Sequence, residues 1–134
     1  MRRRTFLPLL LLSVPALAIE PEADAVRGKL IAGPSVRTAN GQTISLSGDD
    51  PTMLVLNDER LSGADLEVHG HTRAPGQFVV DKIHTRSLFA YQKGKKLMIT
   101  YWCDVCYIRT FAPGPCWCCQ EYTKLDLIDP DTVD

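Results

Sequence analysis

The chain has 134 residues, which is the length of one domain, and its apolar and charged fractions are those of an ordinary globular protein. It carries 15 basic and 16 acidic residues, a formal net charge of −1. This balance argues against non-specific binding to nucleic acid, which needs dense positive charge to displace counterions from phosphates. We therefore expect no nucleic-acid partner.

Residues 1–18 have the composition of a cleavable signal peptide. Three arginines precede an apolar run that starts at Phe6 and is too short to cross a bilayer, and an A-x-A cleavage site follows at Ala16 and Ala18. Removal of this segment leaves 12 basic and 16 acidic residues, a net charge of −4, on a mature chain that begins at Ile19. We expect this chain to be periplasmic or secreted, with no stable membrane anchor.

The arginines also carry a resemblance. The core of a bacterial twin-arginine signal, R-R-x-F-L, is similar to the segment made by Arg3, Arg4, Phe6 and Leu7. The resemblance implies export of a protein that has already folded in the cytoplasm, often with its metal in place. An ordinary secretory signal is the alternative.

After a short leader, residues 19–25, the chain reads as short strands separated by turn residues. Asn40-Gly41 is a strong hairpin signal, residues 57–61 fit one helical turn capped by Asn57 or Asp58, and three lysines around Gly94 mark a basic hairpin tip. No sustained 3.6-residue period appears. The expected strands are 26–31, 43–46, 53–56, 66–70, 78–83, 87–91 and 97–101.

This spacing predicts an all-β fold, a small antiparallel barrel or sandwich spanning residues 26–100. The D-x-R-L-x-G pattern of Asp58, Arg60, Leu61 and Gly63 resembles a turn of OB-fold-like bacterial domains. The longer span 26–125 resembles exported bacterial domains of this kind that end in a cysteine-rich segment. The resemblance implies an OB-like barrel and no activity, since a fold of this type does not by itself imply oligonucleotide binding.

All five cysteines lie in residues 101–125, where two C-x2-C pairs are separated by a short loop. Four thiolates from two such pairs can converge on one tetrahedral ion, which is the structural kind of Zn²⁺ site. The expected ligands are Cys103, Cys106, Cys116 and Cys119. The segment resembles a zinc ribbon or a rubredoxin-like double knuckle, except that no glycine follows Cys106 or Cys119. We expect the aromatic residues crowded beside the cysteines to shield the site from water.

Several alternatives to a zinc knuckle stay open. Cys118 can replace Cys119 as a ligand or remain a free thiol, and the five cysteines can instead form two disulfides and one free thiol. Four thiolates also bind iron, as in a rubredoxin-like electron carrier. The segment from Trp102 to Cys106 resembles the W-C-x-x-C of thiol-disulfide oxidoreductases, but the residues that follow it form a poor helix.

The three histidines suggest at most a minor site. His69 and His71 share one face of an expected strand, where two imidazoles can hold a metal; a solvent-facing polar stripe is the alternative. His84 receives no role. Residues 126–134 read as a loose acidic tail.

Together these patterns favour an exported metal-binding β-domain in which zinc on four cysteines is structural. Nothing in the sequence positions a substrate, so we lean against an enzyme. The expected role is that of a module that binds a partner protein or a small ligand.

Overall fold

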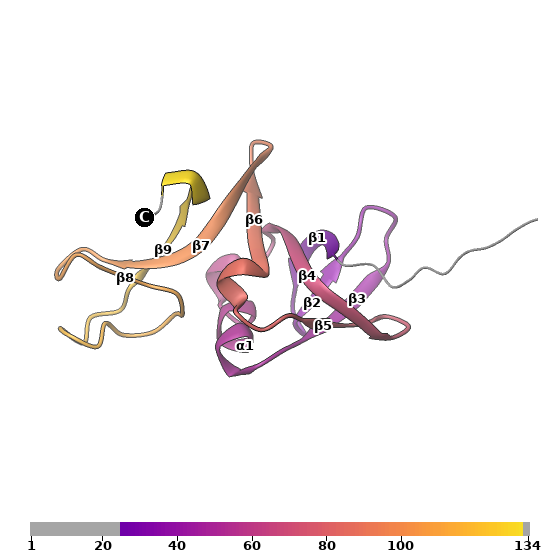
Figure 1. The fold of residues 1–134 in the computed structure, drawn as a ribbon, viewed down its shortest axis with the longest axis horizontal. Helices are drawn as coiled ribbons and strands as arrows, with labels where there is room; N and C mark the ends of the chain where they lie inside the picture. Colours follow the sequence, from indigo (N-terminus) through magenta and orange to yellow (C-terminus); the bar gives the residue numbers. More distant parts are fainter. Residues whose placement is uncertain (1–24, 133–134) are drawn as a thin grey trace, which may run out of the picture.

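The computed structural model describes residues 25–132, which form a barrel at one end and a strand-built arm at the other (Figure 1). We call residues 102–128 the arm. Residues 1–24 lie outside the described part of the chain, and with them the expected twin-arginine signal (Arg3, Arg4, Phe6, Leu7), the cleavage site (Ala16, Ala18) and most of the leader.

Five strands close the barrel: β1 (Ala25–Ile31), β2 (Ser35–Arg37), β3 (Thr43–Ser47), β4 (Asp65–Ala74) and β5 (Gln77–Val80). Their pairing order is β1-β2-β3-β5-β4, and β4 returns to β1, so the ring has no open edge. All these pairs are antiparallel except β3 with β5. The predicted all-β, OB-like barrel is therefore confirmed, including the hairpin at Asn40-Gly41 between β2 and β3.

The segment 53–56, expected to be a buried strand, is instead the end of the helix α1 (Asp50–Leu56). The Asp49 side chain accepts hydrogen bonds from the backbone N–H and the hydroxyl of Thr52, and Pro51 occupies the first turn. These are helix-starting signals, and they outweigh the apolar run that follows. The helix buries one face only: Val55 and Leu56 join the barrel core, whereas Leu54 is 54% exposed.

The strand β4 is the longest of the barrel, and its two halves pair with different strands. Its first half pairs with β1 and with β6 (Leu88–Gln92), and its second half pairs with β5. Gly70 lies at the crossing, where a Cβ atom would lie 1.9 Å from the carbonyl oxygen of Val79. Only glycine allows this close approach of two backbones. The alternating side chains Leu66 and Val68 point into the core.

The arm is a continuation of the same sheet. The strand β7 (Lys95–Cys103) pairs first with β6 and then, further along, with β8 (Ile108–Thr110) and β9 (Lys124–Ile128). Residues 126–128, expected to begin a loose tail, belong to β9, and a 3₁₀ turn at Pro130–Thr132 follows. They are ordered because β9 pairs with β7 along its length and Leu125 and Leu127 pack against the barrel core.

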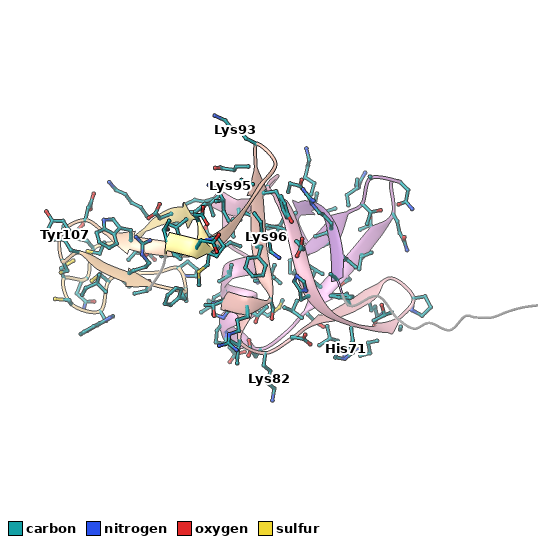
Figure 2. The ribbon with its side chains drawn as sticks, turned by 45° about the horizontal axis from the view of Figure 1, so that its top comes forward. His71, Lys82, Lys93, Lys95, Lys96 and Tyr107 are labelled. Carbon is teal, nitrogen blue, oxygen red and sulfur yellow. The ribbon has the colours of Figure 1, made fainter. Side chains whose placement is uncertain are left out.

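The basic hairpin between β6 and β7 is partly neutralised. Figure 2 shows Lys93 at its tip. Lys95 pairs with Asp129 at 2.8 Å, and Lys96 pairs with Glu67 of β4 at 2.9 Å. Two of the three lysines expected at a solvated tip therefore help to fasten the hairpin to the rest of the sheet.

Candidate metal centre

Two loops of the same construction carry the cysteines. Cys103 ends β7 and Cys106 lies in the turn before β8, while Cys116 and Cys119 frame a second turn. In each loop a backbone N–H reaches back four residues, from Tyr107 to the Cys103 carbonyl oxygen and from Gln120 to that of Cys116, both at 2.8 Å. We call residues 103–107 and 116–120 the knuckle loops.

Backbone N–H groups in both knuckle loops also point at sulfur. The amide of Cys106 donates to Cys103 Sγ and the amide of Cys118 donates to Cys116 Sγ, each at 3.4 Å. Such bonds stabilise a thiolate and fix the direction in which the sulfur points. The loops are therefore organised around the first cysteine of each pair.

The positions directly after Cys106 and Cys119, where such loops usually have glycine, carry other residues with a strained backbone. Tyr107 has φ +55° and Gln120 has φ +68°, so each adopts the left-handed conformation that glycine usually supplies after a C-x2-C pair. Each such residue costs about 1 kcal/mol or more. The sequence singles out these two positions by the glycines that are missing there, but it does not predict that Tyr107 and Gln120 adopt the glycine conformation.

The four expected sulfurs converge. One ligand atom from each of Cys103, Cys106, Cys116 and Cys119 lies within 4.8 Å of all the others, and the Cys103 and Cys119 sulfurs are 3.5 Å apart. A tetrahedron with metal–sulfur bonds of about 2.3 Å has sulfurs about 3.8 Å apart. All five cysteines are free thiols. The arrangement can bind a metal ion; that these four residues are its ligands stays a prediction.

The pKa values of two of these thiols, those of Cys116 and Cys106, are shifted in opposite directions. Backbone N–H groups of Cys119 and Cys118 lower the pKa of Cys116 to about 7. Contact with the Cys118 thiol, followed by burial, raises the pKa of Cys106. The cluster by itself therefore favours one thiolate at Cys116 and a protonated Cys106. A bound dication would remove this imbalance, because it stabilises every thiolate that coordinates it.

Two cysteines, Cys103 and Cys116, are among the few buried side chains of the arm. Among residues 102–132 only Cys103, Cys116 and Thr123 are buried, with exposed fractions of 2%, 0% and 3%. Cys106 and Cys119 are half-buried. The cluster thus occupies the place that an apolar core has in an ordinary domain.

The expectation of an aromatic shield is wrong for Tyr107 and Trp117, whereas Tyr101 is buried and Trp102 is half-buried. Tyr107 and Trp117 are 75% and 74% exposed, and Tyr122 is 75% exposed. Tyr107 lies at the far end of the arm, away from the barrel (Figure 2), where its ring stacks on Trp102 at 6.0 Å between centroids. The rings point outward because the two short turns offer no interior beyond the sulfur cluster.

An arginine latch joins the arm to the barrel. Arg60, in the 3₁₀ turn Glu59–Leu61, binds the nearly buried Asp58 carboxylate with two nitrogens and donates to the Thr123 carbonyl oxygen at 2.8 Å. Burial opposes ionisation of Asp58, but the hydrogen bonds from Arg60 prevail and lower its pKa. The guanidinium lies 5.2 Å from the ring of the buried Tyr101. The D-x-R-L pattern predicted the turn; its contact with the arm was not foreseen.

The redox alternative does not fit this geometry. In a thioredoxin-like site the first cysteine begins a helix, whose N-terminus lowers the thiol pKa. Here Cys103 is the last residue of a strand, and a turn and then another strand follow it.

The histidines lie apart from the cysteines. His69 contacts Glu67 and packs edge-on against Phe89, and His71 is exposed on the same outer face of β4, as the polar-stripe reading expected. His84 contacts the carbonyl oxygen of Phe111. Within residues 25–132 the four-cysteine cluster is the one group of three or more potential ligands close enough to hold a metal.

No protein-family model, curated protein or solved structure matches the chain. No helix among the described residues is long and apolar enough to cross a membrane.

Proposed function

We propose that this protein is an exported β-barrel module whose arm is held in shape by a structural zinc ion on Cys103, Cys106, Cys116 and Cys119. The convergence of the four sulfurs at the ends of two equivalent knuckle loops carries the proposal. Four thiolates leave a zinc ion no open position, so the ion would act as a cross-link rather than as a catalyst.

The composition of the arm supports a structural role for the ion. Apart from Leu125 and Leu127, which pack against the barrel, the arm has few of the apolar contacts that normally hold strands and a long loop together, because two of its three buried side chains are cysteines. A metal bound to preformed thiolates supplies folding free energy in their place. It would also keep the thiols from pairing as disulfides in an oxidising compartment.

The second part of the proposal is that the arm presents a binding surface. Tyr107, Trp117 and Tyr122 are each about three-quarters exposed. Tyrosine and tryptophan are enriched at the centres of protein interfaces, where they contribute large contact areas. A rigid metal-stapled arm would hold these rings in place for a partner protein or a small ligand.

Metal analysis with thiol counting tests the first part. The protein is purified from the cytoplasm under reducing conditions, its metal content is measured, and its reactive thiols are counted before and after chelation. We expect about one zinc per chain and thiols that become reactive only when the metal is removed. Iron with visible charge-transfer absorption would instead indicate an electron carrier. A metal-free protein with two disulfides would refute the staple.

Export is tested separately. Replacement of both arginines, Arg3→Lys with Arg4→Lys, is expected to block export through the twin-arginine route and leave the metal content of the cytoplasmic protein unchanged. Undiminished export of this variant would show that an ordinary secretory signal is in use.

A further inference from the structure

The surface of the barrel has a hollow beside β1 whose charge is mainly positive. Its volume is about 610 Å³. Residues of β1, of the end of β2 with the turn that follows, and of β4 line it, and we call them the basic hollow: Arg27, Gly28, Lys29, Arg37, Thr38 and Asp65. Three of these residues are cations and one is an acid. The basic hollow therefore has an excess of two positive charges.

Lys29 and Arg37 account for this excess. They are direct partners in the antiparallel ladder of β1 and β2, so their Cβ atoms lie about 5 Å apart on one face of the sheet. Both residues are exposed, and among residues 25–132 neither forms an ion pair. Like charges directly opposite each other destabilise a sheet. An anion bound between the two side chains would remove this repulsion.

The acid of the basic hollow is already engaged by its third cation. Asp65 is the β4 partner of Lys29, but its carboxylate binds Arg27 at 3.1 Å. The Arg27 guanidinium also lies over the ring of Tyr91, 3.4 Å from its centroid. Arg27 and Asp65 thus neutralise each other at one side of the basic hollow, and the charges of Lys29 and Arg37 remain for a ligand.

The backbone that carries Arg37 is fixed on both sides. A Cβ atom on Gly28 would lie 2.5 Å from the Arg37 carbonyl oxygen, so only glycine lets the end of β2 lie this close to β1. In the turn that follows, the Thr38 N–H donates to the Gln42 carbonyl oxygen at 2.8 Å, and the Gly41 N–H donates to the Thr38 carbonyl oxygen at 2.9 Å. A wall that is ordered before a ligand arrives lowers the entropy cost of binding.

We propose that the basic hollow binds a phosphate group. A phosphate monoester carries a charge of about −1.5 to −2 at neutral pH, which matches the excess of two positive charges, whereas a single carboxylate supplies only half of it. Arginine binds phosphate oxygens through two parallel N–H groups, and lysine adds a compact charge. The volume of about 610 Å³ has room for a phosphate together with a small organic group.

The charge pattern favours phosphate itself or a small phosphate ester over a nucleic-acid backbone. Residues 25–132 carry equal numbers of basic and acidic residues. Two adjacent cations can neutralise one phosphate monoester, but a polyanion is held by a long series of cations along its backbone. The basic hollow contains no cysteine, so this inference goes beyond the proposed function and does not depend on a bound metal.

An NMR titration of the full chain tests the site. The probes are inorganic phosphate, glycerol 3-phosphate, acetate and a single-stranded oligonucleotide, all at constant ionic strength. We expect both phosphates to shift the amide signals of residues 27–29 and 37–39, and acetate to bind at least about tenfold more weakly. Glycerol 3-phosphate bound more tightly than inorganic phosphate would identify an organic ester as the ligand, and equal affinities would identify phosphate itself.

Three outcomes of this titration would overturn the proposal. They are the absence of shifts at these amides with either phosphate, acetate binding as tight as phosphate binding, and oligonucleotide binding tighter than that of both phosphates.

Matched substitutions locate the site. Lys29→Gln and Arg37→Gln each remove one charge from an exposed residue, so the fold should be kept. We expect each to weaken phosphate binding about tenfold. Lys29→Arg should bind within about threefold of the unchanged chain, because the charge is kept. Lys82→Gln is the control, at an exposed lysine outside the basic hollow (Figure 2), and should bind as the unchanged chain does. An equal loss in Lys82→Gln would refute a specific site.

Melting temperatures give a second readout. Phosphate also stabilises proteins in general through its exclusion from their surface, so the difference between variants is the quantity that counts. Relative to chloride at the same ionic strength, phosphate should raise the melting temperature of the unchanged chain and of Lys82→Gln more than that of Lys29→Gln. The same rise in all three proteins would be the general salt effect and would refute the site.

Discussion

The barrel and the arm are built from the same sheet but are stabilised in different ways. The barrel buries a continuous apolar cluster that includes Leu66, Val68 and Phe78, and β7 extends this cluster as far as Tyr101. Beyond Tyr101 the buried side chains among the described residues are Cys103, Cys116 and Thr123. The same strand therefore passes from a region with a continuous apolar core into one whose buried side chains are two cysteines and a threonine.

This difference indicates why the cysteines lie where they do. A three-stranded extension with one long loop and few buried apolar side chains excludes little water and gains little stability from apolar burial. At its near end the latch and the packing of Leu125 and Leu127 fasten the arm to the barrel, and at its far end the proposed metal would cross-link the knuckle loops. Each of the following substitutions tests either the barrel or the arm and its attachment.

The largest effect is expected from the barrel core. Phe78→Ala removes a ring that is 1% exposed and leaves a cavity, so we expect a loss of about 3–5 kcal/mol in the free energy of unfolding. Chemical denaturation measures the loss. The control Leu54→Ala, at a side chain that is 54% exposed, should change stability by less than about 1 kcal/mol. Equal effects would contradict the assignment of the core.

The next effect is expected at the latch. Arg60→Ala leaves the Asp58 carboxylate and the Thr123 carbonyl oxygen without their donor. Because the arginine side chain is 39% exposed, solvent screening reduces the loss, and we expect about 1–2 kcal/mol. Amide protection in β9 should fall while that in β1 stays. Arg86→Ala, at an exposed arginine, is the control, and a matching loss there would show that the latch is not specific.

An effect of similar size, but dependent on pH, is expected at Glu67, which fastens β6 and β7 to β4. Burial opposes its ionisation, but hydrogen bonds from Lys96, Tyr91 and His69 prevail and lower its pKa from 4.5 to about 2. Its stabilisation is therefore complete above about pH 4.5 and is lost as the pH falls towards 2. We expect Glu67→Gln to cost about 1–2 kcal/mol at pH 6 after screening, and less at pH 3.

The check is the difference in unfolding free energy between the two proteins, measured across this pH range. The control Glu59→Gln, at an exposed carboxylate, should show a difference near zero throughout. A Glu67→Gln difference that grows as the pH falls would have the wrong sign for a lowered pKa.

The smallest effect is expected from a glycine substitution in the second knuckle loop. Gln120→Gly removes the backbone strain of a left-handed residue, but it also raises the conformational entropy of the unfolded chain. The free energy of unfolding should therefore rise by at most about 0.5 kcal/mol. Gln120→Val should lower it by about 1–2 kcal/mol, because a β-branched side chain does not tolerate φ +68°. Melting temperatures of the metal-loaded proteins rank the two variants and the unchanged protein by stability. A valine variant as stable as the glycine variant would show that the loop does not need this conformation.

Local signals in the sequence predicted most of the barrel. Strand alternation around Leu66 and Val68 and the turn at Asn40-Gly41 depend on neighbouring residues alone, and both appear as expected. Residues 53–56 were assigned wrongly because an apolar run of four residues has no period, whereas the cap at Asp49 determines the outcome. Spacing likewise predicted that the four sulfurs would meet.

Contacts between distant residues could not be predicted in this way. The order of residues 126–128 depends on β7, and the latch joins Arg60 to a carbonyl 63 positions further along the chain. The outward direction of Tyr107 and Trp117 depends on how little interior the arm encloses. A sequence pattern contains the chemistry of such side chains but not the surroundings that decide their exposure.

The most direct test of the account is amide hydrogen exchange on the zinc-loaded protein before and after chelation. If sulfur and metal replace an apolar core in the arm, chelation should remove protection from β8, from the knuckle loops and from the adjoining ends of β7 and β9, while β1 to β5 keep theirs. Unchanged protection in the arm after the metal has been removed would contradict the account.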